Sequence, residues 1–297
     1  MMNATRKQWV KRNGKYLIIT LMIFSAILSS CEQQQEHNQE GHVLRQMMMS
    51  QVLEDSIAYQ IYYPPQYGAQ DTFHLLYLLH GHGGSDDDWI TGEEGDVQAI
   101  LDSLIMNDII SPCVAVTFDA GNSWYVNRHR QMEKFFIEEW VSFVSDTLFH
   151  DITFQRRIIA GNSAGGFGAL RLSLLHPELV EASILLSPAA YNPSPPGISS
   201  SRKIDVFSDE EGFSDEIWQS YSYLNISLDT TRMNVYPEFY ISTGDDDAYE
   251  IVDVVVQLRE YLSSLGIQQE LTIIDGGHTW EVWRDRFAFD LVHALGD

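Results

Sequence analysis

Three stretches of the sequence carry residue types that can act together in covalent catalysis. Residues 161–165 read GNSAG, a Gly-x-Ser-x-Gly pattern centred on Ser163, while His278 and the run GDDD at 244–247 lie far along the chain. A serine hydroxyl is a weak nucleophile until a base takes its proton, and the base needs a third group to fix its tautomer and orientation. The serine, the histidine and one of the aspartates could fill these three roles.

The elements around Ser163 indicate how this serine is positioned. Residues 157–160 (RIIA) form a short apolar run typical of a buried strand, and the apolar residues after position 165 recur at helical spacing until His176-Pro177. A strand, a Gly-x-Ser-x-Gly turn and a helix in this order predict a nucleophile elbow, in which the serine sits on a sharp turn above a sheet. A phosphate-binding turn fits less well, because no Gly-x-Gly-x-x-Gly opens the helix and no Walker lysine follows.

The histidine and the aspartates also follow strand patterns. His278 comes after an apolar run at 270–274, and the three aspartates at 245–247 come after the preceding run at 238–243. In α/β-hydrolases the serine, the acid and the histidine occur in this order along the chain, each after a strand. We therefore expect His278 to be the catalytic base, whereas the pattern alone leaves all three aspartates open as the acid.

An oxyanion that develops during acyl transfer needs two N–H donors. One is expected at Ala164, the residue after the serine, and the other in the loop HGHGG at 80–84, which follows a strand pattern at 73–79. The two histidines of this loop could instead suggest a metal site, but no third ligand is evident nearby in the sequence. The aspartates at 86–88 lack the spacing of an EF-hand, and we expect them to form a solvated loop. We expect neither a metal nor a cofactor.

Strand patterns alternate with helix patterns over the rest of the chain, which predicts a mostly parallel sheet covered by helices on both faces. Residues 188–236 interrupt this alternation with four prolines in their first nine positions, and we expect them to form a partial lid over the carboxyl edge of the sheet. Besides the elements already named, the expected strands are 43–51, 57–63, 113–118 and 182–187, and the expected helices are 97–109, 132–149, 248–265 and 284–295.

The first 30 residues have the pattern of an export signal. A basic segment is followed by a short apolar stretch at 16–28, and the sequence Leu-Ser-Ser before Cys31 resembles the lipobox of bacterial lipoproteins. This resemblance implies that Cys31 becomes the lipidated first residue. An ordinary secretory signal with an incidental cysteine is the alternative.

The residues after this signal separate the expected anchor from the expected catalytic domain. Residues 31–41 are mostly polar and lack apolar periodicity, so we interpret them as a flexible tether. Residues 42–297 are then one catalytic domain. We expect a lipid-anchored lipoprotein of the bacterial cell envelope, on the outer membrane or the periplasmic face, whose only membrane contact is the lipid.

The chain is strongly acidic. It has 297 residues, of which 44% are hydrophobic, with 42 acidic and 18 basic side chains and a net charge of −24. Residues 1–30 contain five of the basic side chains and no acidic one, so the 13 that remain against 42 acidic side chains give −29. Such a surface argues against binding to nucleic acid, to an anionic membrane or to a polyanionic substrate. The second cysteine, Cys113, lies in an apolar run and is expected in the core.

The chain resembles a branch of the α/β-hydrolases that includes esterase D (S-formylglutathione hydrolase), feruloyl esterases, enterochelin esterases and the antigen 85 mycolyltransferases. The resemblance covers roughly residues 43–297, and the block around Ser163 is its most specific part. The matching stretches are LLHGHGGSDDDW at 78–89, FDAGNSWY at 118–125, RIIAGNSAGGFGALRLSLLHPELVEASILLSP at 157–188, GDDDAYE at 244–250 and GGHTWEVW at 276–283.

This resemblance implies an α/β-hydrolase fold with a mostly parallel central sheet, helices on both faces and a short lid-like insertion. In the family the acid tends to lie three residues after the glycine, which singles out Asp247, and the second oxyanion donor falls on the backbone N–H of His82. The resemblance also implies four aromatic side chains that line the site: Trp124, Tyr125, Trp280 and Trp283.

Together these patterns predict a serine carboxylic-ester hydrolase that works through an acyl-enzyme. The family resemblance suggests acyl esters of carbohydrates or phenolics, so the expected partner is a small-molecule or glycan-linked ester rather than a nucleic acid. Three alternatives remain open: acyl transfer to a sugar acceptor, a hydrolase-fold binding module without turnover, and peptidase activity.

Overall fold

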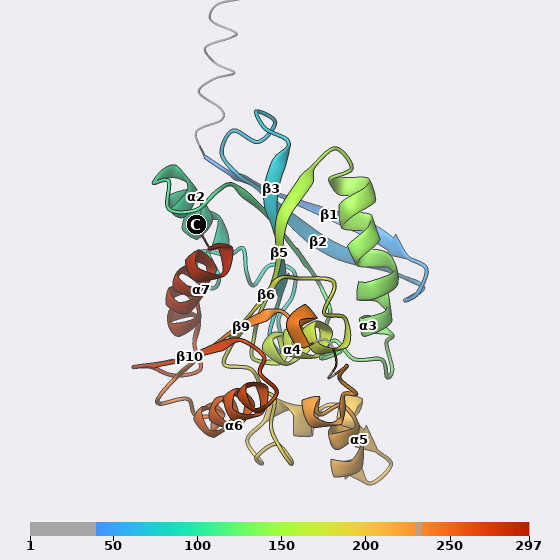
Figure 1. Ribbon diagram of the computed structural model, residues 1–297. Helices are drawn as coiled ribbons and strands as arrows, with labels where there is room; N and C mark the ends of the chain where they lie inside the picture. Colours follow the sequence, from blue (N-terminus) through green and yellow to red (C-terminus); the bar gives the residue numbers. More distant parts are fainter. Residues whose placement is uncertain (1–39, 230, 232, 297) are drawn as a thin grey trace, which may run out of the picture.

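The computed structural model describes residues 40–229, 231 and 233–296 (Figure 1). Its centre is an eight-stranded sheet with the strand order β1-β2-β4-β3-β5-β6-β9-β10. Strand β2 pairs antiparallel with both β1 and β4, and every other pair is parallel. The strands are β1 His42–Ser50, β2 Asp55–Tyr63, β3 Thr72–Leu79, β4 Cys113–Phe118, β5 Thr153–Asn162, β6 Ala182–Leu186, β9 Glu238–Gly244 and β10 Gln269–Ile274.

Helices cover both faces of this sheet (Figure 1). The apolar layer on one face contains residues of α2 and α7, and the layer on the other face contains residues of α3, α4 and α6. Strand β3 shows how one strand serves both layers, because Leu75 and Tyr77 point into the second layer while Leu76 and Leu78 point into the first. The helices are α2 Val97–Met106, α3 Met132–Phe135, α4 Ala164–Leu175, α5 Asp215–Ser220, α6 Ile251–Ser264 and α7 Trp280–Leu295.

The fold is the mostly parallel, two-faced sheet that the alternating pattern predicted, and the strands lie within a few residues of their expected positions. Two helices differ. The expected helix over 132–149 begins as α3 and continues in wider π-helical turns at Phe136–Trp140 and Phe143–Leu148. These wider turns place the large side chains of Phe136 and Trp140 in the core. Helix α7 begins at Trp280, four residues before the apolar pattern suggested.

The insertion at 188–236 packs mainly beside α4. Phe207 and Trp218 are buried, and their rings contact Trp124 and Phe167. The insertion also contains a two-stranded ribbon, β7 Ser208–Asp209 and β8 Gly212–Phe213. Its first residues lie at the carboxyl ends of the sheet strands.

The expected signal and Cys31 lie outside the described residues. Gly41, assigned to the tether from its sequence, is packed against α2 instead: its N–H donates to both carboxylate oxygens of Asp102 at 3.0 Å, and its carbonyl accepts from Gln98 at 2.7 Å. The folded domain therefore includes Gly41. In the described part of the chain, no helix has the length and apolar character that a bilayer crossing requires.

Candidate active site

Ser163 sits on a strained turn between β5 and α4. Its backbone has φ 52° and ψ −114°, a region that L-residues rarely occupy. The turn is possible only because its flanking residues lack side chains: a Cβ on Gly161 would lie 2.3 Å from the carbonyl oxygen of Gly165, and one on Gly165 would lie 2.2 Å from that of Leu79. Such strain, of about 1–3 kcal/mol, is typical of functional sites.

The structure brings the serine, the histidine and one aspartate together. His278 Nε2 lies 2.9 Å from Ser163 Oγ, and His278 Nδ1 lies 2.7 Å from Asp247 Oδ2. The side chain of Asp247 is fully buried and that of His278 is 12% exposed. Because an ionised carboxylate only accepts, Nδ1 carries the proton, and the lone pair of Nε2 faces the serine hydroxyl.

The neighbouring aspartates have different positions. Asp245 and Asp246 are exposed, and Asp245 Oδ1 accepts from the N–H of Gly276 at 3.1 Å. The N–H of Asp246 donates to the Gly276 carbonyl at 2.9 Å, so the acid loop and the histidine loop are joined through their backbones. Only Asp247 of the three therefore faces the imidazole.

Two aromatic rings hold the imidazole from different sides. The ring of Tyr249 lies 4.7 Å from that of His278, and the ring of Trp283 meets it edge-on at 4.9 Å. The backbone N–H of Tyr249 also donates to Asp247 Oδ1 at 2.9 Å. These contacts restrict the rotation of both the base and the acid.

The two expected oxyanion donors lie beside the serine. Ala164 is the first residue of α4, so its N–H has no acceptor within the helix and lies at the positive end of the helix dipole. A Cβ on Gly81 would lie 3.6 Å from Ser163 Cβ, which shows how closely the loop at 80–84 approaches the serine. His82 is exposed on this loop, and desolvation followed by the positive charge of Lys203 lowers the pKa of its imidazole.

Two of the four aromatic residues expected to line the site do not do so. The side chains of Trp124 and Tyr125 are 1% and 2% exposed and belong to the apolar layer that contains α4. Tyr125 contributes differently, because its hydroxyl donates to the carbonyl of His80 at 3.0 Å. The sequence could not separate this buried role from a lining role, since aromatic residues in a loop serve either.

The loop at 119–125 thus holds the loop at 80–84. Besides the Tyr125 bond, the N–H of Ala120 donates to His80 Nε2 at 3.0 Å, and Asn122 Oδ1 accepts from the N–H of Gly83 at 2.8 Å. Since Nε2 accepts, His80 Nδ1 is protonated and donates to the Gly81 carbonyl at 2.8 Å. The fully buried His80 is therefore a backbone support rather than a metal ligand. Within the described ranges, no three histidine, cysteine or acidic side chains converge as a metal-ligand set.

A pocket of about 270 Å³ opens over the serine. Trp280 and Trp283, the other two aromatic residues that the resemblance implied, line it together with Tyr191 and Ser199 from the start of the insertion. The insertion therefore contributes one wall of the pocket, while its Phe207 and Trp218 pack against Phe167 of α4.

Two carboxylates that the sequence did not single out also line this pocket. Asp88 and Glu94 line the pocket together with residues of the loop at 80–84. Desolvation is the main cause that raises the pKa of each carboxyl group. Asp88 Oδ1 accepts from the N–H of Ser85 at 2.8 Å, so its carboxylate is held in place. The expectation of a solvated loop at 86–88 was wrong: Asp86 is fully buried against Arg45 and Asp88 lines the pocket, and nothing local in the sequence indicated either position.

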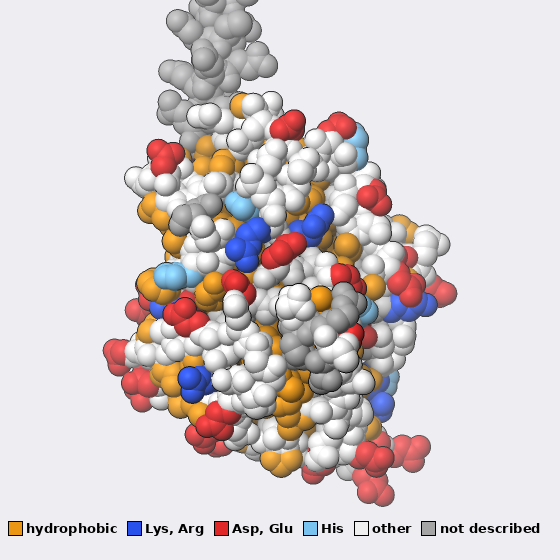
Figure 2. Space-filling view, in the orientation of Figure 1, with side chains coloured by type: hydrophobic (Ala, Val, Ile, Leu, Met, Phe, Trp, Pro, Cys, Tyr) orange, Lys and Arg blue, Asp and Glu red, His pale blue; other side chains and the backbone are white. Residues whose placement is uncertain are grey.

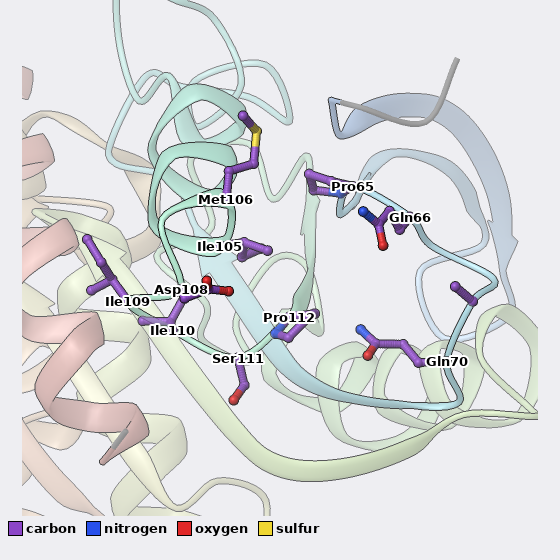
Figure 3. Close-up of a pocket in the computed structure, with 11 residues that line it drawn as sticks. Pro65, Gln66, Gln70, Ile105, Met106, Asp108, Ile109, Ile110, Ser111 and Pro112 are labelled. Carbon is purple, nitrogen blue, oxygen red and sulfur yellow. The ribbon is translucent and has the colours of Figure 1, made fainter. Parts of the chain in front are cut away.

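A larger cavity, of about 870 Å³, lies away from this site (Figure 3). The end of α2 with Met106 forms one side, the segment at 109–112 continues from it, and Pro65 and Gln70 stand opposite. It contains no paired nucleophile and base, so the candidate chemistry belongs to the smaller pocket over Ser163.

The topology of the sheet and the serine at the turn after β5 define an α/β-hydrolase, and solved structures share this fold. A ferulic acid esterase superposes with a TM-score of 0.72 at 21% identity, covering 86% of this chain and 98% of that one. An S-formylglutathione hydrolase from Agrobacterium tumefaciens superposes with a TM-score of 0.65 at 17% identity, covering 86% of this chain and 95% of that one.

The chain belongs to the family described as "Putative esterase", which it matches over residues 50–294, and it is a carboxylesterase. It is 26% identical over 236 residues to an acetyl esterase of Caldicellulosiruptor saccharolyticus, covering 75% of this chain and 84% of that protein. It is 27% identical over 132 residues to an endo-1,4-beta-xylanase/feruloyl esterase of Xylanibacter ruminicola. That match covers 42% of this chain and 18% of that protein, so this chain spans only part of the second relative's length.

Proposed function

We propose that Ser163, His278 and Asp247 form the catalytic triad of this esterase. Ser163 Oγ attacks the ester carbonyl while His278 Nε2 takes its proton, and the proton then passes to the departing alcohol. Water, deprotonated by the same nitrogen, releases the acyl group from the serine. The observation that carries this proposal is the pair of hydrogen bonds, 2.9 and 2.7 Å, through opposite nitrogens of one imidazole.

The backbone N–H groups of Ala164 and His82 stabilise the oxyanion in this proposal. The first lies at the start of α4, and the second lies on the loop that passes beside Ser163. Asp247 orients the imidazole and stabilises the imidazolium that forms during the attack. Each of these roles follows from where the groups lie relative to the serine hydroxyl.

We propose acyl esters of carbohydrates or phenolics as the substrates. The acetyl esterase and feruloyl esterase names belong to the relatives, and they suggest this class for the present chain. The pocket supports it: tryptophan rings give a surface for a sugar or phenolic ring, and the hydroxyl and carboxylate groups can bind sugar hydroxyls.

We further propose that Cys31 carries a lipid and anchors the enzyme on the extracytoplasmic side of the bacterial envelope, which suits insoluble or glycan-linked substrates. The sequence before Cys31 supports this proposal. Metabolic labelling with an alkyne fatty acid, compared between the full chain and its Cys31→Ser variant, tests it: label that persists in the variant would contradict it.

A fluorophosphonate probe tests the triad. The probe should label the wild-type enzyme, label should be lost in Ser163→Ala, and the variant should hydrolyse acetyl, butyryl and feruloyl esters at background rates only. The Ser163→Ala variant should keep the backbone conformation and unfold at nearly the wild-type temperature. A loss of activity can then be distinguished from a loss of folding. Turnover that survives in Ser163→Ala would show that another residue is the nucleophile, and products that appear only with a sugar acceptor would indicate transfer.

A further inference from the structure

A buried line of side chains extends behind the acid of the proposed triad. Trp283 Nε1 lies 3.0 Å from Ser187 Oγ, Ser187 Oγ lies 3.1 Å from Thr243 Oγ1, and Thr243 Oγ1 lies 3.3 Å from Asp247 Oδ2. Ser187 and Thr243 are fully buried. The three residues come from α7, the end of β6 and the end of β9, so the line joins three elements behind one carboxylate.

The chemistry of the two ends fixes the direction of every hydrogen bond in this line. An indole N–H can only donate and an ionised carboxylate can only accept. Ser187 Oγ therefore accepts from Trp283 and has its own proton free for Thr243. The Thr243 hydroxyl donates to Asp247 at 3.3 Å, and the Gly244 carbonyl at 3.4 Å is a second acceptor for the same proton. Each donor points toward the acid.

The backbone at Ser187 is held in an unusual conformation that serves this line. Ser187 has φ 44°, in the left-handed region that disfavours residues with a side chain, and its N–H donates to the Ser242 carbonyl at 2.7 Å. A serine in a position that favours glycine has a structural or functional reason. Here the side chain accepts from the buried indole N–H of Trp283, which would otherwise lack its partner, and also reaches the hydroxyl of Thr243.

We propose that Trp283, Ser187 and Thr243 are positioning residues that orient Asp247 through a one-way hydrogen-bond relay. This inference rests on the proposed function, because it assigns Asp247 as the acid. In addition to His278 Nδ1, the carboxylate accepts from Thr243 at one oxygen and from the Tyr249 N–H at the other. The relay fixes the plane of the carboxylate, so that Oδ2 stays aligned with the imidazole.

The test compares Thr243→Val, which keeps the shape of threonine but has no hydroxyl, with Thr243→Ser, which keeps the hydroxyl. We expect Thr243→Val to lower kcat about tenfold with KM within about twofold of wild type, and Thr243→Ser to restore most of kcat. The low-field proton resonance of the imidazole Nδ1–H should shift in the valine variant and return toward its wild-type position in the serine variant. Ser183→Ala is the matched control, since Ser183 on β6 is also buried but its hydroxyl has no partner among the described residues.

Two results would overturn the relay: a wild-type kcat in Thr243→Val, or equal losses in the valine and serine variants, which would mean that packing explains the effect. If Thr243→Val does not fold, Ser187→Ala takes its place: it removes the donor to Thr243, so the relay predicts a lower kcat with KM near that of wild type, and a wild-type kcat in this variant would overturn the relay. The failure of the triad proposal gives a different result, because Asp247→Asn would then keep full activity. If only the relay proposal is wrong, Asp247→Asn loses its activity and Thr243→Val keeps a wild-type kcat.

Discussion

The imidazole of His278 is constrained on nearly every side. Its two nitrogens bond to a serine and an aspartate, and the rings of Tyr249 and Trp283 contact it in a tilted and an edge-to-face arrangement. A base that is already oriented loses little entropy when the substrate arrives, so more of the binding energy can lower the barrier. The geometry at single residues is therefore that of a site prepared before the substrate binds.

Asparagine in place of Asp247 should lower kcat by several orders of magnitude, about 10⁴ in the best-studied serine hydrolases, because the amide cannot hold the reactive tautomer. The same change at Asp245 or Asp246 should leave kcat within about threefold of wild type, since both side chains are exposed and neither faces His278. Steady-state kinetics of all three variants on one chromogenic ester shows which aspartate is the catalytic acid. A crippled Asp245→Asn or Asp246→Asn beside an active Asp247→Asn would identify a different acid.

Tyr125→Phe should lower kcat about tenfold, less than the 10²–10³ expected when an oxyanion donor is lost outright. Burial raises the pKa of Tyr125 well above its ordinary value, so its hydroxyl is a donor at every working pH. Phenylalanine keeps the ring in the core and removes only the bond to the His80 carbonyl. Rates measured with matched thermal unfolding curves test this; a full rate in the stable variant would show that the loop at 80–84 holds its shape without that bond.

At the scale of elements, β5, the turn and α4 form a unit whose close packing depends on glycine. Helix α4 approaches the end of β3 at Gly165, where no side chain could fit against the Leu79 carbonyl. This approach places Ala164, the first residue of the helix, beside the loop at 80–84 that carries the second proposed oxyanion donor. The fit between these elements therefore sets the spacing of the two proposed donors.

Gly165→Ala should reduce the free energy of unfolding by more than about 3 kcal/mol, because the new methyl group would meet backbone rather than a movable side chain. The matched control is Gly197→Ala in the insertion, where a Cβ has nothing within 4 Å and where we expect a change of no more than about 0.5 kcal/mol. Urea unfolding of both variants measures the difference. Equal stability of the two would mean that α4 can shift away from β3 without penalty.

The elements that sequence predicted best are those whose pattern is local. The run at 157–160 and the helical spacing after Ser163 predicted the strand, the turn and the helix, whereas the pattern left three aspartates open and only the family resemblance favoured Asp247, the one that faces His278. The line from Trp283 through Ser187 to Thr243 had no such signal, because it joins side chains from three elements that meet only in the folded sheet.

The positions of Asp88 and Tyr125 could not be predicted from the sequence for related reasons. Asp88 lies in an acidic run that resembles a solvated loop, and only the turn before α2 directs it to the pocket. The expectation that Tyr125 lines the site was wrong because an aromatic residue in a loop has the same local pattern whether it faces a pocket or the core. Burial of this kind is decided by packing between distant segments.

At the scale of the whole molecule, charge is the dominant feature. The net charge is −24, and acidic side chains are spread over the face shown in Figure 2 with few lysines and arginines among them. Asp88 and Glu94 bring the same sign into the pocket itself. A substrate with a negative charge therefore meets repulsion both on approach and on binding.

The charge predicts how substrate preference depends on salt. The p-nitrophenyl esters of acetic and succinic acid share a leaving group, and the succinyl group is longer by a methylene and carries a carboxylate. The enzyme should hydrolyse the succinate with a lower kcat/KM at low ionic strength, and the part of this difference that salt removes is due to the charge. Between roughly 10 and 150 mM salt the Debye length falls from about 30 to about 8 Å. Over this range kcat/KM for the succinate should rise several-fold while that for the acetate stays flat. Replacing Glu94 with glutamine should reduce the salt dependence only in part, because Asp88 remains in the pocket and Glu94 is one of many carboxylates that generate the field of the whole surface. If both esters respond equally to salt, the acidic surface does not select the substrate, and neutral sugar esters lose this part of their support.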